Sequence, residues 1–172
     1  MIDFTKSKQY TLSIRLSTDG FSFSIYNPIH DDSLSIIEKE IDTSLSLTAN
    51  LKAVFHESDF LNHPYKRVNI MMASKRFTIA PLDLFEEGQA ELLFYHNHQK
   101  RENETVLYNI LRKNNVAVIF GIDKSAQTFL NEQYPEARFY SQSTPFIDYF
   151  SVKSRLGNSK KTVSYTHLTL PT

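Results

Sequence analysis

The amino-acid sequence predicts an α/β domain in which a mixed β-sheet opens with an antiparallel meander and is flanked by helices. Three observations support this prediction. Residues 10–41 contain three strand-like runs, residues 43–55 carry a helical apolar stripe, and strand-like and helix-like runs alternate from there to residue 156. Strands and helices mixed along one short chain indicate layers of helices packed on a sheet.

The opening meander rests on alternation and on turn residues. Residues 10–17 and 21–26 place apolar side chains at every second position, which is the period of a strand with one buried face. The segment between them is Thr18-Asp19-Gly20, and Asp-Gly between alternating runs favours a hairpin turn. A third strand over Ser33–Ile41 completes the predicted meander.

The later elements follow from caps, breakers and periodicity. Thr43 or Ser44 is the predicted N-cap of a helix with Leu47, Leu51, Val54 and Phe55 on one face. Asp123 is the predicted cap of a helix that ends at Tyr134-Pro135, and Ser143 or Thr144 caps a last helix with Phe146, Ile147 and Phe150 buried. The remaining predicted elements are strands at residues 67–73, 76–80, 105–111, 116–122 and 137–140 and a helix at 86–95.

Composition excludes several classes of protein. The 172 residues contain 19 Lys and Arg against 19 Asp and Glu, and a nucleic-acid binder is expected to carry a basic excess. There is no cysteine, which excludes disulfides, thiol catalysis and thiolate metal sites. No apolar run approaches the roughly 20 residues of a membrane span, and the N-terminus lacks a secretory pattern. We therefore expect a cytoplasmic protein without membrane or nucleic-acid partners.

Three stretches carry a family resemblance. They are residues 10–27, the Phe77–Pro81 segment that leads into Phe85-Glu86-Glu87, and Phe129–Pro135. Together they resemble domain-of-unknown-function family 3822, bacterial proteins with an actin-like ATPase (ribonuclease H-like) fold. The resemblance implies that this chain is the first of two related actin-like halves. Because the family has no established activity, the resemblance implies a fold rather than a reaction.

The actin-like superfamily supplies one motif that can be compared with this chain. Its first hairpin carries an Asp followed two residues later by Gly, both near the nucleotide phosphates and metal. Here Arg15 and Ser17 stand at those positions; an arginine cannot organise magnesium, and Ser blocks a close backbone approach. A shifted alignment would use Asp19, which the hairpin turn explains better. The candidate cofactor contacts are therefore Ser17, Thr18, Asp19 and Gly20.

The segment His96-Asn97-His98 is a candidate metal site. Two imidazoles at i and i+2 of an extended segment face the same side and can share a metal, with Glu102 or Glu104 as a third ligand. This arrangement would suit a metal-dependent nuclease. A solvated polar loop is the alternative, and the sequence favours it.

The C-terminal end has an unusual sequence. Val163–Thr172 matches, residue by residue, a translation of the transposase adapter used in short-read DNA library preparation, whereas a natural strand is the alternative. We therefore predict a truncated, metagenomic fragment with a first actin-like half at residues 1–156, a linker at 157–162 and an adapter-derived segment at 163–172. Surfaces between the two halves would then be exposed, and the isolated chain would be poorly soluble.

The predicted function is that of a non-catalytic, actin-like-fold module for protein interaction or scaffolding. Tyr26, Tyr95 and Tyr108 are the candidate protein-binding surface, and the Lys153–Lys161 stretch is interpreted as a solvated helix end and linker. The alternative is an ATP-binding protein whose main nucleotide contacts lie in the missing half. In that case ATP and magnesium would bind only to the full-length protein, and no cofactor is expected in this half.

Overall fold

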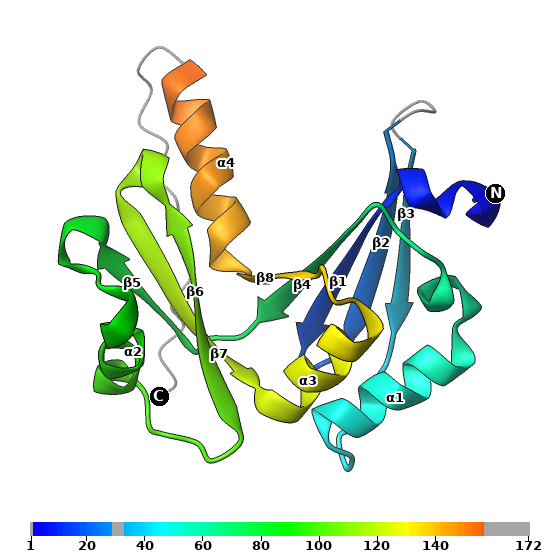
Figure 1. The fold of residues 1–172 in the computed structure, drawn as a ribbon, viewed down its shortest axis with the longest axis horizontal. Helices are drawn as coiled ribbons and strands as arrows, with labels where there is room; N and C mark the ends of the chain where they lie inside the picture. Colours follow the sequence, from blue (N-terminus) through cyan, green and yellow to red (C-terminus); the bar gives the residue numbers. More distant parts are fainter. Residues whose placement is uncertain (1, 29–32, 157–172) are drawn as a thin grey trace.

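The meander forms as predicted and begins the larger of two sheets. The computed structural model describes residues 2–28 and 33–156 (Figure 1). The antiparallel strands β1 (Thr11–Ser17), β2 (Phe21–Asn27) and β3 (Ser33–Lys39) occupy one side of this sheet. In β1 and β2 every second side chain is buried, as the alternation of apolar and polar residues requires.

Two parallel strands complete the larger sheet. β4 (Arg67–Ala73) pairs with β1, and β8 (Arg138–Ser141) pairs with β4, which gives the order β3-β2-β1-β4-β8. The antiparallel strands β5 (Phe77–Pro81), β7 (Val116–Asp123) and β6 (Glu104–Leu111) form a second sheet, in that order, between β4 and β8 in the chain. The observed fold is thus the predicted mixed α/β arrangement.

Two helices cover one face of the larger sheet. α1 (Leu47–Glu57) and α3 (Lys124–Gln133) lie next to each other below this sheet in Figure 1. The main core lies between them and the strands, and includes Leu12, Ile14, Phe23, Leu51 and Leu130. A smaller core beneath the second sheet surrounds Phe94 of α2 (Ala90–Asn97).

Short 3-10 helices connect these elements. They are η1 (Phe4–Gln9), η2 (Asp59–Asn62), η3 (Leu82–Leu84), η4 (Glu87–Gln89) and η5 (Arg112–Asn114). The helix predicted over residues 86–95 is therefore wrong at both ends. Glu86 is extended and Gly88 lies in η4, so the α-helix begins only at Ala90, because glycine carries the highest backbone entropy cost of helix formation.

The cap predicted for α1 is also wrong. Ser46, rather than Thr43 or Ser44, accepts a hydrogen bond from the backbone N–H of Ala49 at 3.2 Å. Ser44 lies in the turn that precedes the helix, where its backbone N–H and its hydroxyl both donate to the carboxylate of Asp42, at 2.9 and 2.6 Å. In contrast, Asp123 caps α3 as predicted and accepts from the N–H of Ala126 at 2.8 Å.

The last helix, α4 (Ser143–Leu156), departs most from expectation. Its side chains Phe146 and Phe150 were expected in the core but are 61% and 42% exposed, and only Ile147 is half-buried. The helix packs on β8, η5 and β6, whereas Phe146, Tyr149 and Phe150 stay exposed among the described residues. The predicted linker and adapter-like segment, residues 157–172, lie outside the described residues.

Candidate functional site

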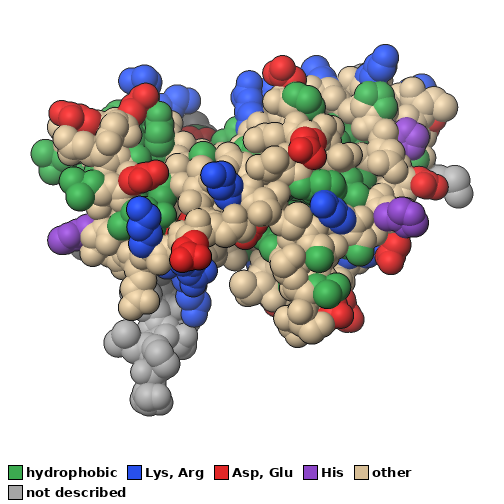
Figure 2. Space-filling model, turned by 60° about the horizontal axis from the view of Figure 1, so that its bottom comes forward, with side chains coloured by type: hydrophobic (Ala, Val, Ile, Leu, Met, Phe, Trp, Pro, Cys, Tyr) green, Lys and Arg blue, Asp and Glu red, His purple; other side chains and the backbone are tan. Residues whose placement is uncertain are grey.

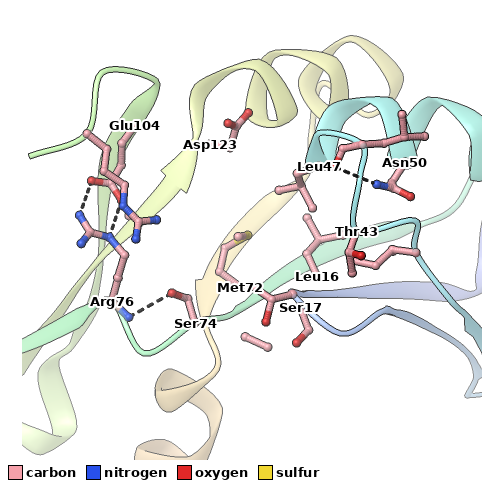
Figure 3. A pocket seen from close by; sticks show the side chains of 16 residues that line it. Leu16, Ser17, Thr43, Leu47, Asn50, Met72, Ser74, Arg76, Glu104 and Asp123 are labelled. Carbon is pink, nitrogen blue, oxygen red and sulfur yellow. Dashed lines mark hydrogen bonds and ion pairs between the residues drawn. The ribbon is translucent and has the colours of Figure 1, made fainter.

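A cleft of about 420 Å³ opens where the carboxyl ends of β1 and β4 meet the second sheet. Its lining combines apolar side chains such as Leu16, Leu47 and Met72 with the polar residues Ser17, Thr18, Ser74, Arg76, Glu104 and Asp123 (Figure 3). An apolar concavity with a few polar groups is the usual form of a ligand site. This cleft is the candidate functional site.

The four hairpin residues predicted as cofactor contacts are divided between two faces. Ser17 and Thr18 line the cleft, whereas Asp19 and Gly20 line a separate groove together with Arg15. The hydroxyl of Ser17 donates to the carboxylate of Asp19, and this hydrogen bond holds the pKa of the Asp19 carboxyl below its ordinary value. The two polar groups are therefore turned toward each other within the hairpin.

Gly20 has a structural explanation in this turn. Its φ of 156° is a conformation that residues with a side chain rarely adopt, and a Cβ there would lie 3.0 Å from the carbonyl oxygen of Lys39 on β3. The glycine thus permits close packing of the hairpin turn against β3. The close approach of Gly20 to β3 therefore explains the glycine without a bound phosphate.

Arg76 and Glu104 form an ion pair at the wall of the cleft that belongs to the second sheet. Nε and Nη2 of Arg76 donate to Oε1 and Oε2 of Glu104 at 2.8 and 2.7 Å, and Nη2 also donates to the carbonyl oxygen of Gln99 at 2.8 Å. The guanidinium lies over the ring of Phe94, 5.4 Å from its centroid. The hydrogen bonds to Glu104 raise the pKa of Arg76, so each charge of the pair is already neutralised by the other.

Asp123, which lines the cleft together with Arg76, Arg101 and Glu104, also has local partners. Besides capping α3, its carboxylate accepts from Nδ2 of Asn103 at 2.7 Å and from the hydroxyl of Thr48 at 3.4 Å. A carboxylate with three such donors is poorly placed to organise a metal ion as well.

The two histidines predicted as a metal pair do not share a face. His96 is exposed in the last turn of α2. His98 follows the helix; its ring lies tilted against that of Phe94, with the centroids 4.6 Å apart, and its Nε2 contacts the carbonyl oxygen of Phe77 at 3.1 Å. The extended segment that the shared-metal prediction requires is therefore absent. Glu102 is exposed and Glu104 is paired with Arg76, and residues 2–28 and 33–156 contain no cluster of three potential metal ligands.

The three tyrosines expected to form one binding surface are divided between two lobes, one built around the larger sheet and one around the second sheet. Tyr26 is exposed on β2 of the larger sheet, whereas Tyr95 and Tyr108 pack against the smaller core, next to Phe94 and Phe85.

Acidic and basic side chains are interspersed over the face shown in Figure 2. No helix in the described part of the chain has the length and apolarity that a membrane crossing needs.

Sequence reasoning missed two polar groups, one at the cleft and one that joins β6 to β8 and α4. The first is the Arg76–Glu104 pair, whose members are 28 positions apart and for which the sequence gives no signal. The second is Asn109, in the middle of an otherwise largely apolar strand. A polar amide inside a strand is a usable signal, because it needs hydrogen-bond partners when the strand is covered.

The mixed sheet with its flanking helices belongs to a class of protein, namely one with an actin-like ATPase fold. A solved structure from Bacteroides thetaiotaomicron VPI-5482, described as a protein with actin-like ATPase fold and unknown function, matches with a TM-score of 0.87 and 82% sequence identity. The match covers 92% of this chain and 62% of that one. The chain thus spans less than two thirds of the length of this relative.

The chain belongs to the family described as Protein of unknown function (DUF3822), whose sequence profile matches residues 1–168. The family resemblance inferred from the hairpin and the two later segments is therefore confirmed. The match includes residues 163–168, so the adapter-derived origin of residues 163–172 stays a prediction. Comparison with curated proteins gives no match.

Proposed function

We propose that this chain is a non-catalytic, actin-like-fold module for protein interaction or scaffolding. The observation that supports the proposal most directly is the pairing of polar groups around the cleft. Ser17 is bonded to Asp19, Arg76 to Glu104, and Asp123 to the start of α3. Catalysis of phosphoryl transfer depends on charged groups placed to meet phosphate and metal. Of the charged side chains that line the cleft, Arg76, Glu104 and Asp123 are instead bonded to neighbouring groups, and Arg101 has no such bond among the described residues.

The surface proposed for a partner lies on the open face of β2 and β3, which we call the β2–β3 patch and define as Tyr26, Leu34 and Ile36. The strand register places Tyr26 opposite Leu34 and Ser24 opposite Ile36, so these apolar side chains share one face. All three are exposed, and β3 is the edge strand of the larger sheet as described. Contiguous exposed apolar side chains on a sheet edge are typical of a protein contact.

The experiment combines a nucleotide titration with a surface variant. We expect no saturable heat when magnesium-ATP is titrated into the full-length family protein, and no shift in its melting temperature. In the organism that encodes the protein, an Ile36→Asp variant should lose a partner that cross-links to the β2–β3 patch of the unaltered protein. Leu92 is an exposed residue of α2 in the other lobe, so Leu92→Asp is the matched control and should retain that partner. Saturable ATP binding, or cross-linked partners that survive Ile36→Asp, would contradict the proposal.

The second candidate is an ATP-binding protein whose main contacts lie in the part of the family's chain beyond this match. Two observations favour it: the relative is described as having an actin-like ATPase fold, and Ser17 and Thr18 do line a cleft at the ends of β1 and β4. Glycine-rich phosphate loops in the remaining part of the gene, together with saturable magnesium-ATP binding, would establish this candidate. We propose a cytoplasmic location in either case, because a chain without cysteine has no disulfide of the kind that stabilises proteins in oxidising compartments.

A further inference from the structure

The outer side of α4 carries a row of aromatic side chains that nothing in the described structure covers. Phe146, Tyr149 and Phe150 are 61%, 53% and 42% exposed, and Val152 is 42% exposed beside them. We call Phe146, Tyr149 and Phe150 the α4 ridge. Residues at i, i+3 and i+4 lie on one face of a helix, so the ridge is a continuous apolar stripe.

The inner side of α4 is held firmly against the second sheet and its turn. The hydroxyl of Thr144 donates to Oδ1 of Asn109 at 2.8 Å, and Nδ2 of Asn114 donates to the carbonyl oxygen of Ile147 at 3.4 Å. These contacts fix the rotation of the helix about its axis. The ridge therefore faces outward as a consequence of specific bonds on the opposite side, and a slight rotation of the helix would not bury it.

The ridge also differs from the exposed apolar residues elsewhere on this lobe. Leu84 and Leu92 are 73% and 71% exposed and lie in different elements, η3 and α2, whereas the ridge places three aromatic rings on one helix. The rings of Tyr149 and Phe150 contact each other at 5.6 Å, and Lys153 lies over Tyr149 at 4.9 Å. Scattered exposed leucines are ordinary, but a contiguous aromatic stripe marks a contact surface.

We propose that the α4 ridge is the surface on which the remaining part of the family's chain packs, as an intramolecular contact. The Bacteroides thetaiotaomicron relative is 82% identical but has more than a third of its chain outside the match. That additional chain needs a surface on the shared fold, and the aromatic stripe of α4 is an apolar surface that the described residues leave uncovered. The inference is independent of the proposed function, which depends on the β2–β3 patch of the other lobe.

Hydroxyl-radical footprinting read by mass spectrometry tests this contact without a mutation. In the 172-residue chain, Phe146, Tyr149 and Phe150 should be labelled at rates typical of exposed aromatic residues. In the full-length relative the residues aligned with the ridge should be labelled severalfold more slowly, while the residue aligned with exposed Leu84 should be labelled equally in both. Equal labelling of the ridge in both chains would overturn the proposal.

A substitution provides a second, independent measurement. Phe150→Ser should leave the melting temperature of the 172-residue chain nearly unchanged, because the side chain is exposed there, and the aligned substitution should lower that of the full-length relative by several degrees. Leu92→Ser is the matched control and should change neither. If the full-length variant fails to fold, the labelling comparison still decides. Slow labelling of the ridge in a dimer of the 172-residue chain, seen by light scattering, would assign the surface to a second copy and overturn the proposal.

Discussion

Asn109 and Thr144 connect the second sheet to the last helix through a single side-chain contact. Oδ1 of Asn109, in β6, accepts from the hydroxyl of Thr144 at 2.8 Å and from the backbone N–H of Ser141 at 3.1 Å. Nδ2 of the same amide donates to the carbonyl oxygen of Phe139 in β8 at 2.9 Å. One half-buried amide thus joins β6 to the edge of the larger sheet and to the first turn of α4.

Replacing Asn109 by Ala should lower the free energy of unfolding by about 2–3 kcal/mol, because four side-chain hydrogen bonds are lost and part-buried partners are left unpaired. Thr144→Val removes only one donor and should cost about 1 kcal/mol. Urea unfolding followed by circular dichroism measures both. Asn97→Ala is the control, because Asn97 is exposed and its side chain donates to the hydroxyl of Thr78 at a distance of 3.5 Å. An Asn109→Ala chain as stable as the control would contradict this role.

The sequence predicted the parts of the fold that depend on local pattern. The hairpin at Asp19-Gly20 and the Asp123 cap form as expected, because turn chemistry and capping involve residues only a few positions apart. The Ser46 cap was missed because several hydroxyl residues precede α1, and Asp42 takes the earlier one. The exposure of Phe146 could not be predicted, since the helical stripe indicates an apolar contact but not which part of the chain supplies it.

The candidate site was less accessible to sequence reasoning than the fold. The hairpin marked Ser17 and Thr18 as candidate cofactor contacts, and both line the cleft. The opposite wall comes from Arg76 and Glu104, which meet only because β5 and β6 flank β7. The histidine pair was misjudged because α2 continues through His96 and Asn97, so the segment is helical where an extended loop was assumed. Pairings at long sequence separation are determined by the sheet order, which a single sequence does not define.

Glu104 and Gly121 should be strongly coupled. A Cβ on Gly121 would lie 2.4 Å from Oε1 of Glu104, so Gly121→Ala must displace the carboxylate from Arg76. We expect a loss of about 1–3 kcal/mol in the free energy of unfolding, since the hydrogen bonds between two part-buried charged groups are broken. In a Glu104→Ala background the same glycine substitution should cost much less, because the obstructing carboxylate is gone. A double-mutant cycle measures this difference, and strictly additive effects would rule out the coupling.

The N-cap of α1 can be tested by comparing two neighbouring serines. Ser46→Ala removes the acceptor for the Ala49 N–H and should lower the free energy of unfolding by about 1 kcal/mol, the usual cost of losing a cap. Ser44→Ala removes only an exposed hydrogen bond to Asp42 and should cost less. Thermal unfolding of both variants gives the comparison. A larger loss from Ser44→Ala would return the cap to the position that the sequence first indicated.

Stability should decrease at alkaline pH because of two tyrosines that support η2. The hydroxyl of Tyr65 donates to the carbonyl oxygen of Phe60, and that of Tyr134 donates to the carbonyl oxygen of Leu61, each at 2.6 Å. Burial raises the pKa of Tyr65 to about 12 and shifts the pKa of Tyr134 further in the same direction. Both side chains are therefore protonated in the folded protein at pH values where the unfolded chain already loses these protons.

The sign of the effect follows from linkage. A folded-state pKa above the unfolded value of 10.0 contributes stability that is fully present below pH 10 and is lost as the pH rises toward 12 and beyond. Urea unfolding at pH 8, 10 and 11 should show this decrease, and a Tyr65→Phe, Tyr134→Phe double variant should be less stable at pH 8 but less dependent on pH above 10. Tyr26→Phe, at an exposed position, is the control and should keep the pH dependence of the unaltered chain. An unchanged slope in the double variant would show that other groups cause the alkaline loss.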